Sequence, residues 1–187
     1  MSIPREPPDA KVIVGLLFRE FSIQRQTLVS LTERFGPLDF LSEPKPFDYT
    51  AYYEEEMGPS LYRQTASFEE LVGSDSLAEI KLFSNEIEKR FAHENHRRVN
   101  IDPGFLTEER FVLATGKNYT HRIYLREGIF ADLTLIYQKG SFNVLPWTYP
   151  DYRESELLHF LGALRQKLIY QRTKRLPRKA RAEGVPS

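Results

Sequence analysis

The chain has 187 residues, of which 41% are hydrophobic and 28% are charged, a composition typical of a globular domain and unlike that of a disordered chain. It contains no cysteine, which excludes disulfide bonds and thiolate metal sites and favours a reducing compartment. The 26 basic and 26 acidic residues balance, yet eight of the basic and only one of the acidic residues follow Leu164. An acidic body therefore carries a basic C-terminus.

The termini and the apolar runs bear on domain organisation. Residues 1–10 contain three prolines and mixed charges, unlike a signal peptide, and we expect a flexible N-terminus there. The longest apolar run, residues 12–18, is too short to span a bilayer. We expect one domain over residues 11–170, a basic and disordered tail over residues 171–187, a cytoplasmic location and no membrane partner.

The first half of the chain alternates strand and helix patterns. Residues 11–18 are apolar and rich in β-branched side chains, which predicts a buried strand. Ser22 is a candidate N-cap for a helix that ends at Gly36. Residues 38–47 contain two prolines and predict an edge strand or loop, and residues 61–68 predict another strand.

The next helix has the clearest pattern. Ser76 and Glu79 match a capping box, and apolar residues follow at helical spacing. We expect a short strand over residues 98–101, a turn at residues 102–104 and a third, shorter helix that starts at Thr107 and ends before Gly116.

The second half predicts a hairpin and a terminal helix. Residues 121–125 and 129–138 form two strand patterns around a glycine turn, and both faces of the second are apolar, which predicts a central strand. A third strand is expected near residues 142–145. Asp151 and Glu154 match a capping pair at the start of a final helix.

These elements together predict an α/β protein of the α+β type. The order strand, helix, strand, strand, helix, strand is that of a ferredoxin-like split βαβ core. The later strands would extend this core as a β-meander, with the C-terminal helix packed on it.

The common cofactor motifs are missing. Gly116 and Lys117 are the nearest approach to a phosphate-binding P-loop, but the other required glycine and the hydroxyl residue are absent, and no G-x-G-x-x-G occurs. His93 and His96 lie three residues apart near a predicted helix end, and two ligands without a third predict an exposed helix end rather than a metal site. The sequence therefore names no cofactor.

One polar cluster predicts an anion-binding pocket. Asn100 and Asp102 alternate along a short strand, while Lys117 lies just before His121 and Arg122 at the start of the hairpin. If these segments meet at one sheet end, the cations would bind an anion. Asp102 or His121 could then transfer a proton and are the catalytic candidates. The alternative is a structural rim of ion pairs around Asp102.

Two aromatic segments add ligand-binding candidates. Residues 47–58 carry four carboxylates and three tyrosines, among them Tyr53 and Glu56, which we place near the same ligand; a solvated turn is the alternative. Trp147 lies between two prolines and would offer a stacking surface for a ring, or else a rigid cover over the core.

Several phrases carry a family resemblance. Together they resemble an uncharacterised bacterial family, the domain of unknown function 4416, over residues 11–170: VIVGLLF (12–18), FDYTAYYEEEMG (47–58), NIDPGFLT (100–107), HRIYLREGIFADLTLIYQKG (121–140) and LPWTYPDYR (145–153). The resemblance implies a bacterial cytosolic protein and supplies no site residues. Members are sometimes labelled GTP-binding proteins, but this sequence has neither a phosphate loop nor an N-K-x-D guanine signature.

Two functions from different classes remain open. The first is binding of a small molecule, nucleotide or other phosphate-bearing ligand, with or without catalysis, in one concave pocket. The alternative is a non-catalytic interaction module that meets a protein partner, a second copy in a homodimer, or nucleic acid through the basic tail.

Overall fold

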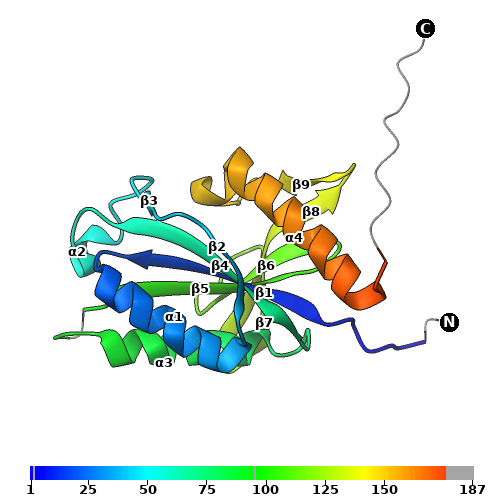
Figure 1. Ribbon diagram of the computed structural model, residues 1–187, viewed down its shortest axis with the longest axis horizontal. Coiled ribbons are helices and arrows are strands. Elements are labelled where there is room, and N and C mark those ends of the chain that lie inside the picture. The colour runs from blue at the N-terminus through cyan, green and yellow to red at the C-terminus, as the bar shows by residue number, and fades with distance from the viewer. Residues whose placement is uncertain (2, 95, 176–187) are drawn as a thin grey trace, which may run out of the picture.

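A computed structural model describes residues 1, 3–94 and 96–175 of the chain. Within these residues the fold is α+β, with four α-helices, one 3₁₀ helix and a nine-stranded sheet, and the predicted class is confirmed (Figure 1). The elements in chain order are β1 (Ala10–Phe18), α1 (Phe21–Phe35), β2 (Leu38–Leu41), β3 (Lys45–Pro46), α2 (Glu54–Met57), β4 (Tyr62–Val72), α3 (Leu77–Phe91), β5 (Val99–Leu106), β6 (Arg110–Thr115), β7 (Arg122–Arg126), β8 (Ile129–Gln138), β9 (Ser141–Val144), η1 (Pro150–Arg153) and α4 (Ser155–Thr173).

The sheet combines two interleaved crossovers with a later group of hairpins. Its strand order is β2-β4-β1-β5-β6-β8-β7, while β3 pairs with β4 and β9 pairs with β8. Helix α1 joins β1 to β2 across β4, and helix α3 joins β4 to β5 across β1. All of these pairings are antiparallel. The predicted hairpin of β7 and β8 is confirmed, and β8 is flanked on both edges as its apolar faces require.

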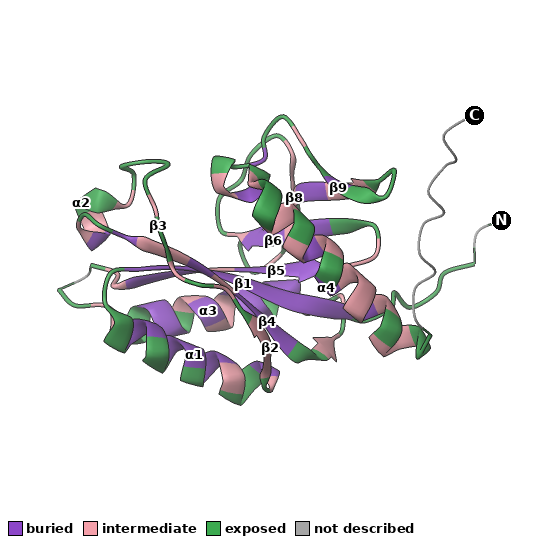
Figure 2. Ribbon diagram, turned by 45° about the horizontal axis from the view of Figure 1, so that its top comes forward, coloured by how far each residue is buried: buried purple, intermediate pink, exposed green. Residues whose placement is uncertain are grey.

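Strand β1 is the centre of the molecule, since all nine of its residues are buried (Figure 2). Val12, Val14, Leu16 and Phe18 face the core formed with α1 and α3. Ile13 alternates with them and packs instead into a second core with α4. A strand covered on both faces needs a nearly continuous apolar run, and this explains the sequence of residues 11–18.

The helices cover the two faces of the sheet unequally. Helices α1 and α3 lie side by side on one face, and α4 lies across the other face over β6, β8 and β9 (Figures 1 and 2). Leu161 and Leu164 of α4 pack against Phe111, Leu135 and Phe142 there. Helix α4 covers only part of its face, and the uncovered end contains the candidate site described below.

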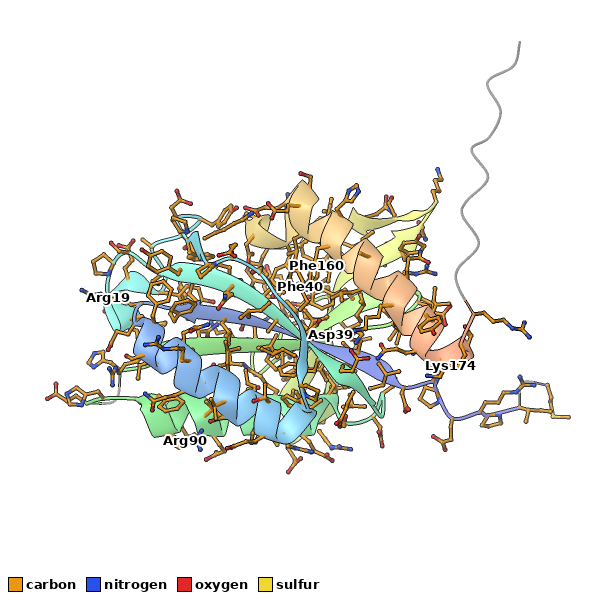
Figure 3. The ribbon with its side chains drawn as sticks, viewed as in Figure 1. Arg19, Asp39, Phe40, Arg90, Phe160 and Lys174 are labelled. Carbon is orange, nitrogen blue, oxygen red and sulfur yellow. The ribbon has the colours of Figure 1, made fainter. Side chains whose placement is uncertain are left out.

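A buried ion pair ties α4 to the edge of the sheet. The Lys11 Nζ donates to Asp39 Oδ2 at 2.7 Å and to the Phe68 carbonyl at 2.7 Å, and the side chains of Lys11 and Asp39 are 0% and 2% exposed. Lys167 of α4 reaches the same Asp39 oxygen at 2.9 Å. Nearby, the Phe40 and Phe160 rings pack with their centroids 3.8 Å apart (Figure 3).

The predicted third helix between Thr107 and Gly116 is wrong. Thr107, Glu108 and Glu109 form the turn of a hairpin, and residues 110–115 form β6. Phe111 contributes to the core beneath α4, whereas Ala114 contributes to the core on the opposite face, which is the two-residue period of a strand. The local sequence of residues 110–115 fits a helix or a strand. Pairing with β5 on one edge and β8 on the other makes it a strand.

The predicted side-chain caps at the helix N-termini are also wrong, although these helices themselves and the end of α1 at Gly36 are confirmed. Helix α1 is capped at Glu20, so Ser22 lies inside it. The Ser76 hydroxyl donates to the Gly73 carbonyl rather than capping α3, and no side chain caps α4 at Glu154. The Asp151 carboxylate instead pairs with Arg63 of β4 at 3.1 Å. An ion pair with this arginine competes with an exposed helix N-terminus for the same carboxylate.

The C-terminal helix runs to Thr173, into the segment expected to be a disordered tail. Arg172 pairs with Glu108 at 3.1 Å and donates to the Asp9 carbonyl, so the first tail residues pack on the body. Residues 176–187 of the expected tail lie outside the described residues. Among the helices of the described segments, none combines the length and the apolar character that crossing a bilayer requires.

Candidate functional site

The candidate site begins where β5 and β6 separate. The two strands pair only over Gly104–Leu106 and Phe111–Leu113, so the first half of β5 has β1 as its partner on one edge only. The turn predicted at residues 102–104 is therefore wrong, because the strand continues through Pro103. Proline has no backbone N–H, and it stands where β5 would next donate to β6. The ladder ends there, and a gap opens in the sheet.

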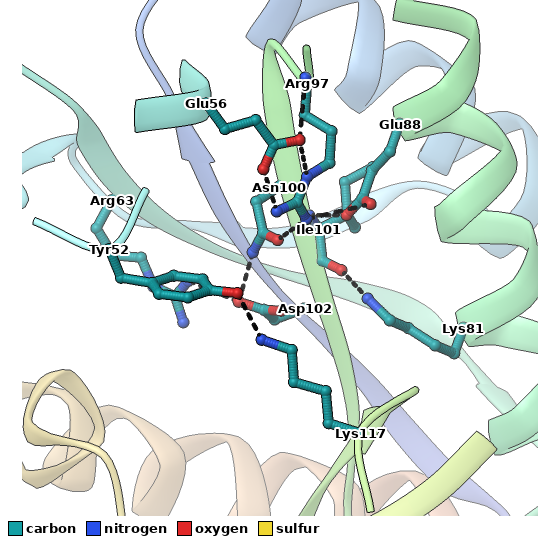
Figure 4. A network of polar contacts seen from close by, with 10 residues as sticks. All are labelled: Tyr52, Glu56, Arg63, Lys81, Glu88, Arg97, Asn100, Ile101, Asp102 and Lys117. Carbon is teal, nitrogen blue, oxygen red and sulfur yellow. Dashed lines mark hydrogen bonds and ion pairs between the residues drawn. The ribbon is translucent and has the colours of Figure 1, made fainter. Parts of the chain in front are cut away.

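Side chains of α3 replace the missing strand at this gap. The Ile101 N–H donates to Glu88 Oε1 at 2.6 Å, and the Ile101 carbonyl accepts from Lys81 Nζ at 2.7 Å (Figure 4). The backbone N–H and C=O of Ile101 are thereby both satisfied away from water. Burial raises the pKa of Glu88, against the attraction of Lys81.

A cleft of about 750 Å³ lies over the gap, large enough for a ligand of nucleotide size. Its walls come from β4, β5, β6 and α3, from the segment before α2, from the loop after β6 and from the segment that forms η1. The side chains that give it polar or aromatic character are Phe47, Tyr49, Tyr52, Tyr53, Arg63, Lys81, Asn85, Glu88, Arg97, Asn100, Asp102, Lys117, Arg122, Asp132, Tyr149, Asp151 and Tyr152.

Arg63 forms the inner end of the cleft. Its Nη1 lies 3.2 Å from Asp102 Oδ2, and its Nη2 lies 3.1 Å from Asp151 Oδ2 and donates to the Tyr152 hydroxyl at 2.6 Å. The guanidinium lies over Gly15, where a Cβ would come within 2.5 Å of Nη2. A glycine on the central strand therefore makes room for a buried cation between two carboxylates.

The two carboxylates on Arg63 have pKa values shifted in opposite directions. Burial raises the pKa of Asp102, but Arg63 and Lys81 outweigh burial, and its pKa lies below the ordinary 3.8. Burial dominates at Asp151 and raises its pKa above 3.8 despite Arg63. Asp102 is thus an ionised acceptor near neutral pH, whereas Asp151 holds its proton more readily.

A chain of hydrogen bonds connects Asp102 to α2. Asn100 donates to Asp102 Oδ2 at 2.9 Å and accepts from Arg97 Nη1 at 2.7 Å. Arg97 in turn holds Glu56 of α2 through two contacts, at 2.7 and 2.6 Å (Figure 4). The arginine lowers the pKa of Glu56 by hydrogen bonding. The position of Asp102 is therefore linked to that of the segment that closes the cleft.

Two cations stand at the rim. Lys117 Nζ donates to the Tyr52 hydroxyl at 2.8 Å and lies 4.6 Å from the centre of that ring. Arg122 Nε donates to Asp132 Oδ2 at 2.8 Å, and its two Nη atoms donate to the Lys117 carbonyl at 2.9 Å and to the Tyr149 hydroxyl at 3.1 Å. The rim thus combines positive charge with aromatic rings.

His121 and Trp147 lie behind the wall rather than in it. The two rings stack with centroids 4.7 Å apart, and His121 Nε2 lies 3.2 Å from Asp132 Oδ2. Trp147 donates from Nε1 to the Leu133 carbonyl at 2.7 Å. Within the part of the chain that the structure describes, His121 Nδ1 is buried without a hydrogen-bond partner. His121 thus reaches the cleft lining through Asp132.

The structure brings five of the eight candidate residues together at the cleft: Tyr53, Asn100, Asp102, Lys117 and Arg122. Glu56 lies outside the lining and binds Arg97, which lines the cleft. His121 likewise lies outside the lining and contacts Asp132, which is part of it. Sequence reasoning missed Arg63, Arg97 and Asp132, and it missed the polar stripe that Lys81, Asn85 and Glu88 form on α3. Their spacing along an otherwise apolar helix face was a usable indication.

The cleft carboxylates do not gather into a metal site. Across residues 1, 3–94 and 96–175, no three histidine or acidic side chains are placed to share one ion. Asp102, Asp132 and Asp151 instead each pair with an arginine. The arrangement is one of alternating charges that can hold a ligand with both acceptor and donor groups.

Comparison with known proteins gives a family but no relative of known function. Residues 8–168 match the family model described as Domain of unknown function (DUF4416). No curated protein and no solved structure matches the chain significantly. The matched region includes every strand and all but the last turn of α4, and hence the whole cleft. The chain therefore belongs to the family of this domain of unknown function.

Proposed function

We propose that the protein binds a small phosphate-bearing ligand with an aromatic ring, such as a nucleotide, in the cleft between β5 and β6. The main support is the lining of the cleft, where six aromatic side chains alternate with five basic ones around about 750 Å³. Aromatic faces stack on a ring, and basic side chains bind a phosphate. The absence of cysteine supports a reducing compartment, so we infer action in a bacterial cytoplasm.

The strand order supports a ferredoxin-like assignment for the first half of the fold. Strands β2, β4, β1 and β5 are neighbours in that order, and both connecting helices cover one face. The other face of these strands is left for a ligand at the end that α4 does not cover. The proposed ligand would therefore lie on the open face of this unit.

Calorimetry on the full chain tests the proposal directly. A first thermal-shift screen would use nucleoside mono-, di- and triphosphates, sugar phosphates and dicarboxylates. For any binding compound, Lys117→Ala should weaken binding by about tenfold or more, because a charge-assisted contact is lost. Lys89→Ala is the matched control, since Lys89 is an exposed lysine outside the cleft. Unchanged affinity in Lys117→Ala, or no stabilisation by any compound, contradicts the proposal.

Catalysis in this cleft is part of the same proposal. Asp102 and Asp151 are the candidate groups for proton transfer, because Arg63 holds both carboxylates at the inner end of the cleft and their pKa values are shifted in opposite directions. NMR of the bound compound over hours would detect turnover. Asp102→Asn should abolish turnover and keep binding, whereas turnover by this variant at the rate of the unchanged protein rejects the assignment.

An interaction module is the second candidate, supported by the sheet edge at β7. Ile123, Tyr124 and Leu125 are 69%, 58% and 38% exposed on this edge strand, and such strands tend to pair with another chain. A second copy is the simplest partner, and nucleic acid binding by the tail stays a weaker alternative because Arg172 already contacts the body. Light scattering of the purified protein tests the homodimer, and Ile123→Lys should return it to a monomer.

A further inference from the structure

We propose that the Tyr52 hydroxyl occupies the place on Lys117 that a phosphate oxygen of the ligand takes, so that binding displaces the Tyr52 side chain from the rim. This inference rests on the proposed function and adds an internal competitor to it. The cleft would then be held partly closed by its own chain until a phosphorylated small molecule replaces one hydroxyl.

The contact on Lys117 has the chemistry of a ligand contact. An ammonium group carries three donors and prefers an oxygen with negative character. Among the described residues Lys117 forms no ion pair with a carboxylate, and the Tyr52 hydroxyl at 2.8 Å is the acceptor for its Nζ. Hydrogen bonding to Lys117 lowers the pKa of the Tyr52 phenol, so this oxygen is polarised toward the phenolate and resembles an anionic oxygen.

The other cations of the cleft are already held by their neighbours. Arg63 lies between Asp102 and Asp151, and Arg97 is held by both oxygens of Glu56. Displacing any of those partners would separate a buried or half-buried charge pair, which is costly. The contact at Lys117 joins the cation to one neutral, exposed side chain, so it can be exchanged without separating an ion pair.

Besides the contact with Lys117, leaving the rim costs Tyr52 one edge-to-face contact with the Tyr53 ring, whose centroid lies 5.1 Å away. Its side chain is 61% exposed, and the described residues offer its hydroxyl no hydrogen bond besides that from Lys117. The adjacent Tyr53 is the anchor of the segment, since it packs against the core of Leu17, Met57 and Leu61. A rotation of the Tyr52 side chain therefore suffices, and exposed contacts of this kind contribute little to stability.

Pyrophosphate is the probe for a calorimetric test on the full chain. Tyr52→Phe removes only the competing hydroxyl, and we expect its pyrophosphate affinity to rise about threefold, which matches the loss of one exposed contact. Tyr170→Phe is the matched control, because Tyr170 is an exposed tyrosine of α4 far from the cleft lining. Its affinity should equal that of the unchanged protein.

The phenol itself provides a second measurement. In protein labelled with ¹³C-tyrosine, the pKa of Tyr52 should rise toward its ordinary value of 10.0 when pyrophosphate is added, since Lys117 leaves it. A pKa that stays constant, or a Tyr52→Phe variant that binds equally or more weakly, overturns the displacement while pyrophosphate binding itself supports the proposed function. No pyrophosphate binding by either protein overturns both.

Discussion

The guanidinium of Arg63 lies directly over Gly15, so that the residue type at position 15 controls where a buried cation of the cleft can lie. A methyl group at position 15 would meet Nη2 at 2.5 Å. The guanidinium is the flexible end of a long side chain, so it would move before the backbone of β1 does. Its contacts with Asp102 and Asp151 would be lost with that movement.

Gly15→Ala should therefore damage the site more than the fold. We expect the free energy of unfolding to fall by about 1–3 kcal/mol from overpacking, measured by urea denaturation. Binding of any ligand found by calorimetry should weaken as well. Gly162→Ala is the control, because nothing lies near its added methyl group and alanine favours a helix by about 0.5–1 kcal/mol. Equal stability of both variants would contradict the close approach.

Asp39→Ala should be strongly destabilising. The substitution leaves Lys11 buried and without its carboxylate, and breaking such a pair costs about 3–5 kcal/mol. Burial lowers the pKa of Lys11, so part of this loss would be relieved as the lysine gives up its proton at high pH. Glu86→Ala removes an exposed pair with Lys89 and should change the free energy of unfolding by less than about 1 kcal/mol. A loss at Asp39 as small as this would show that the pair contributes little.

Asp102 should make the protein more stable as the pH rises. Its pKa in the folded state lies below 3.8, so its contribution is fully present above that value and is lost as the pH falls through the lower, folded pKa. Urea denaturation of the unchanged protein and of Asp102→Asn at pH 3 and pH 7 measures this. The stability difference between them should be larger at pH 7, and a difference independent of pH would refute the shift.

Asp151 should behave in the opposite way. Its pKa in the folded state lies above 3.8, so its contribution is fully present below 3.8 and is lost as the pH rises through the folded value. Compared with the unchanged protein, Asp151→Asn should therefore lose less stability at pH 7 than at pH 3. If the stability difference changed with pH in the same direction for the Asp102 and Asp151 variants, the pKa values of the two carboxylates would not be shifted in opposite directions.

Pro103→Ala should extend the β5–β6 ladder. The new N–H faces the gap, at the position where β6 continues toward Ala114. We expect this amide to be protected from hydrogen exchange and the affinity for any cleft ligand to fall as the strands approach. Rapid exchange at position 103 would mean that the side chains lining the gap, rather than the proline, keep the strands apart.

The local patterns of the sequence predicted most strands and three helices because their apolar periods were long. The run of β1 and the glycine turn between β7 and β8 are examples, and both are confirmed. The segment at Thr107 was misjudged, because an acidic turn after a threonine looks like the start of a helix. Only pairing with β5 and β8, which is invisible locally, makes it a hairpin.

The candidate site was predicted in outline, since residues near Asn100 and near Lys117 do meet. Arg63 could not be found this way, because a basic residue in a strand of mixed polarity gives no indication of which face it occupies. Its role depends on Gly15 of a different strand. Asp151 was assigned to a helix cap because its true partner lies 88 positions earlier in the chain.

The side chains that stand in for a strand at Ile101 also determine which parts of the cleft are free to respond to a ligand. Because Lys81 and Glu88 bind the backbone C=O and N–H of Ile101, helix α3 cannot slide along the sheet without leaving these two buried groups unpaired. The floor is thus fixed by the backbone itself. Any adjustment to an incoming molecule must come from the tyrosine-bearing segment before α2 and from the loop after β6.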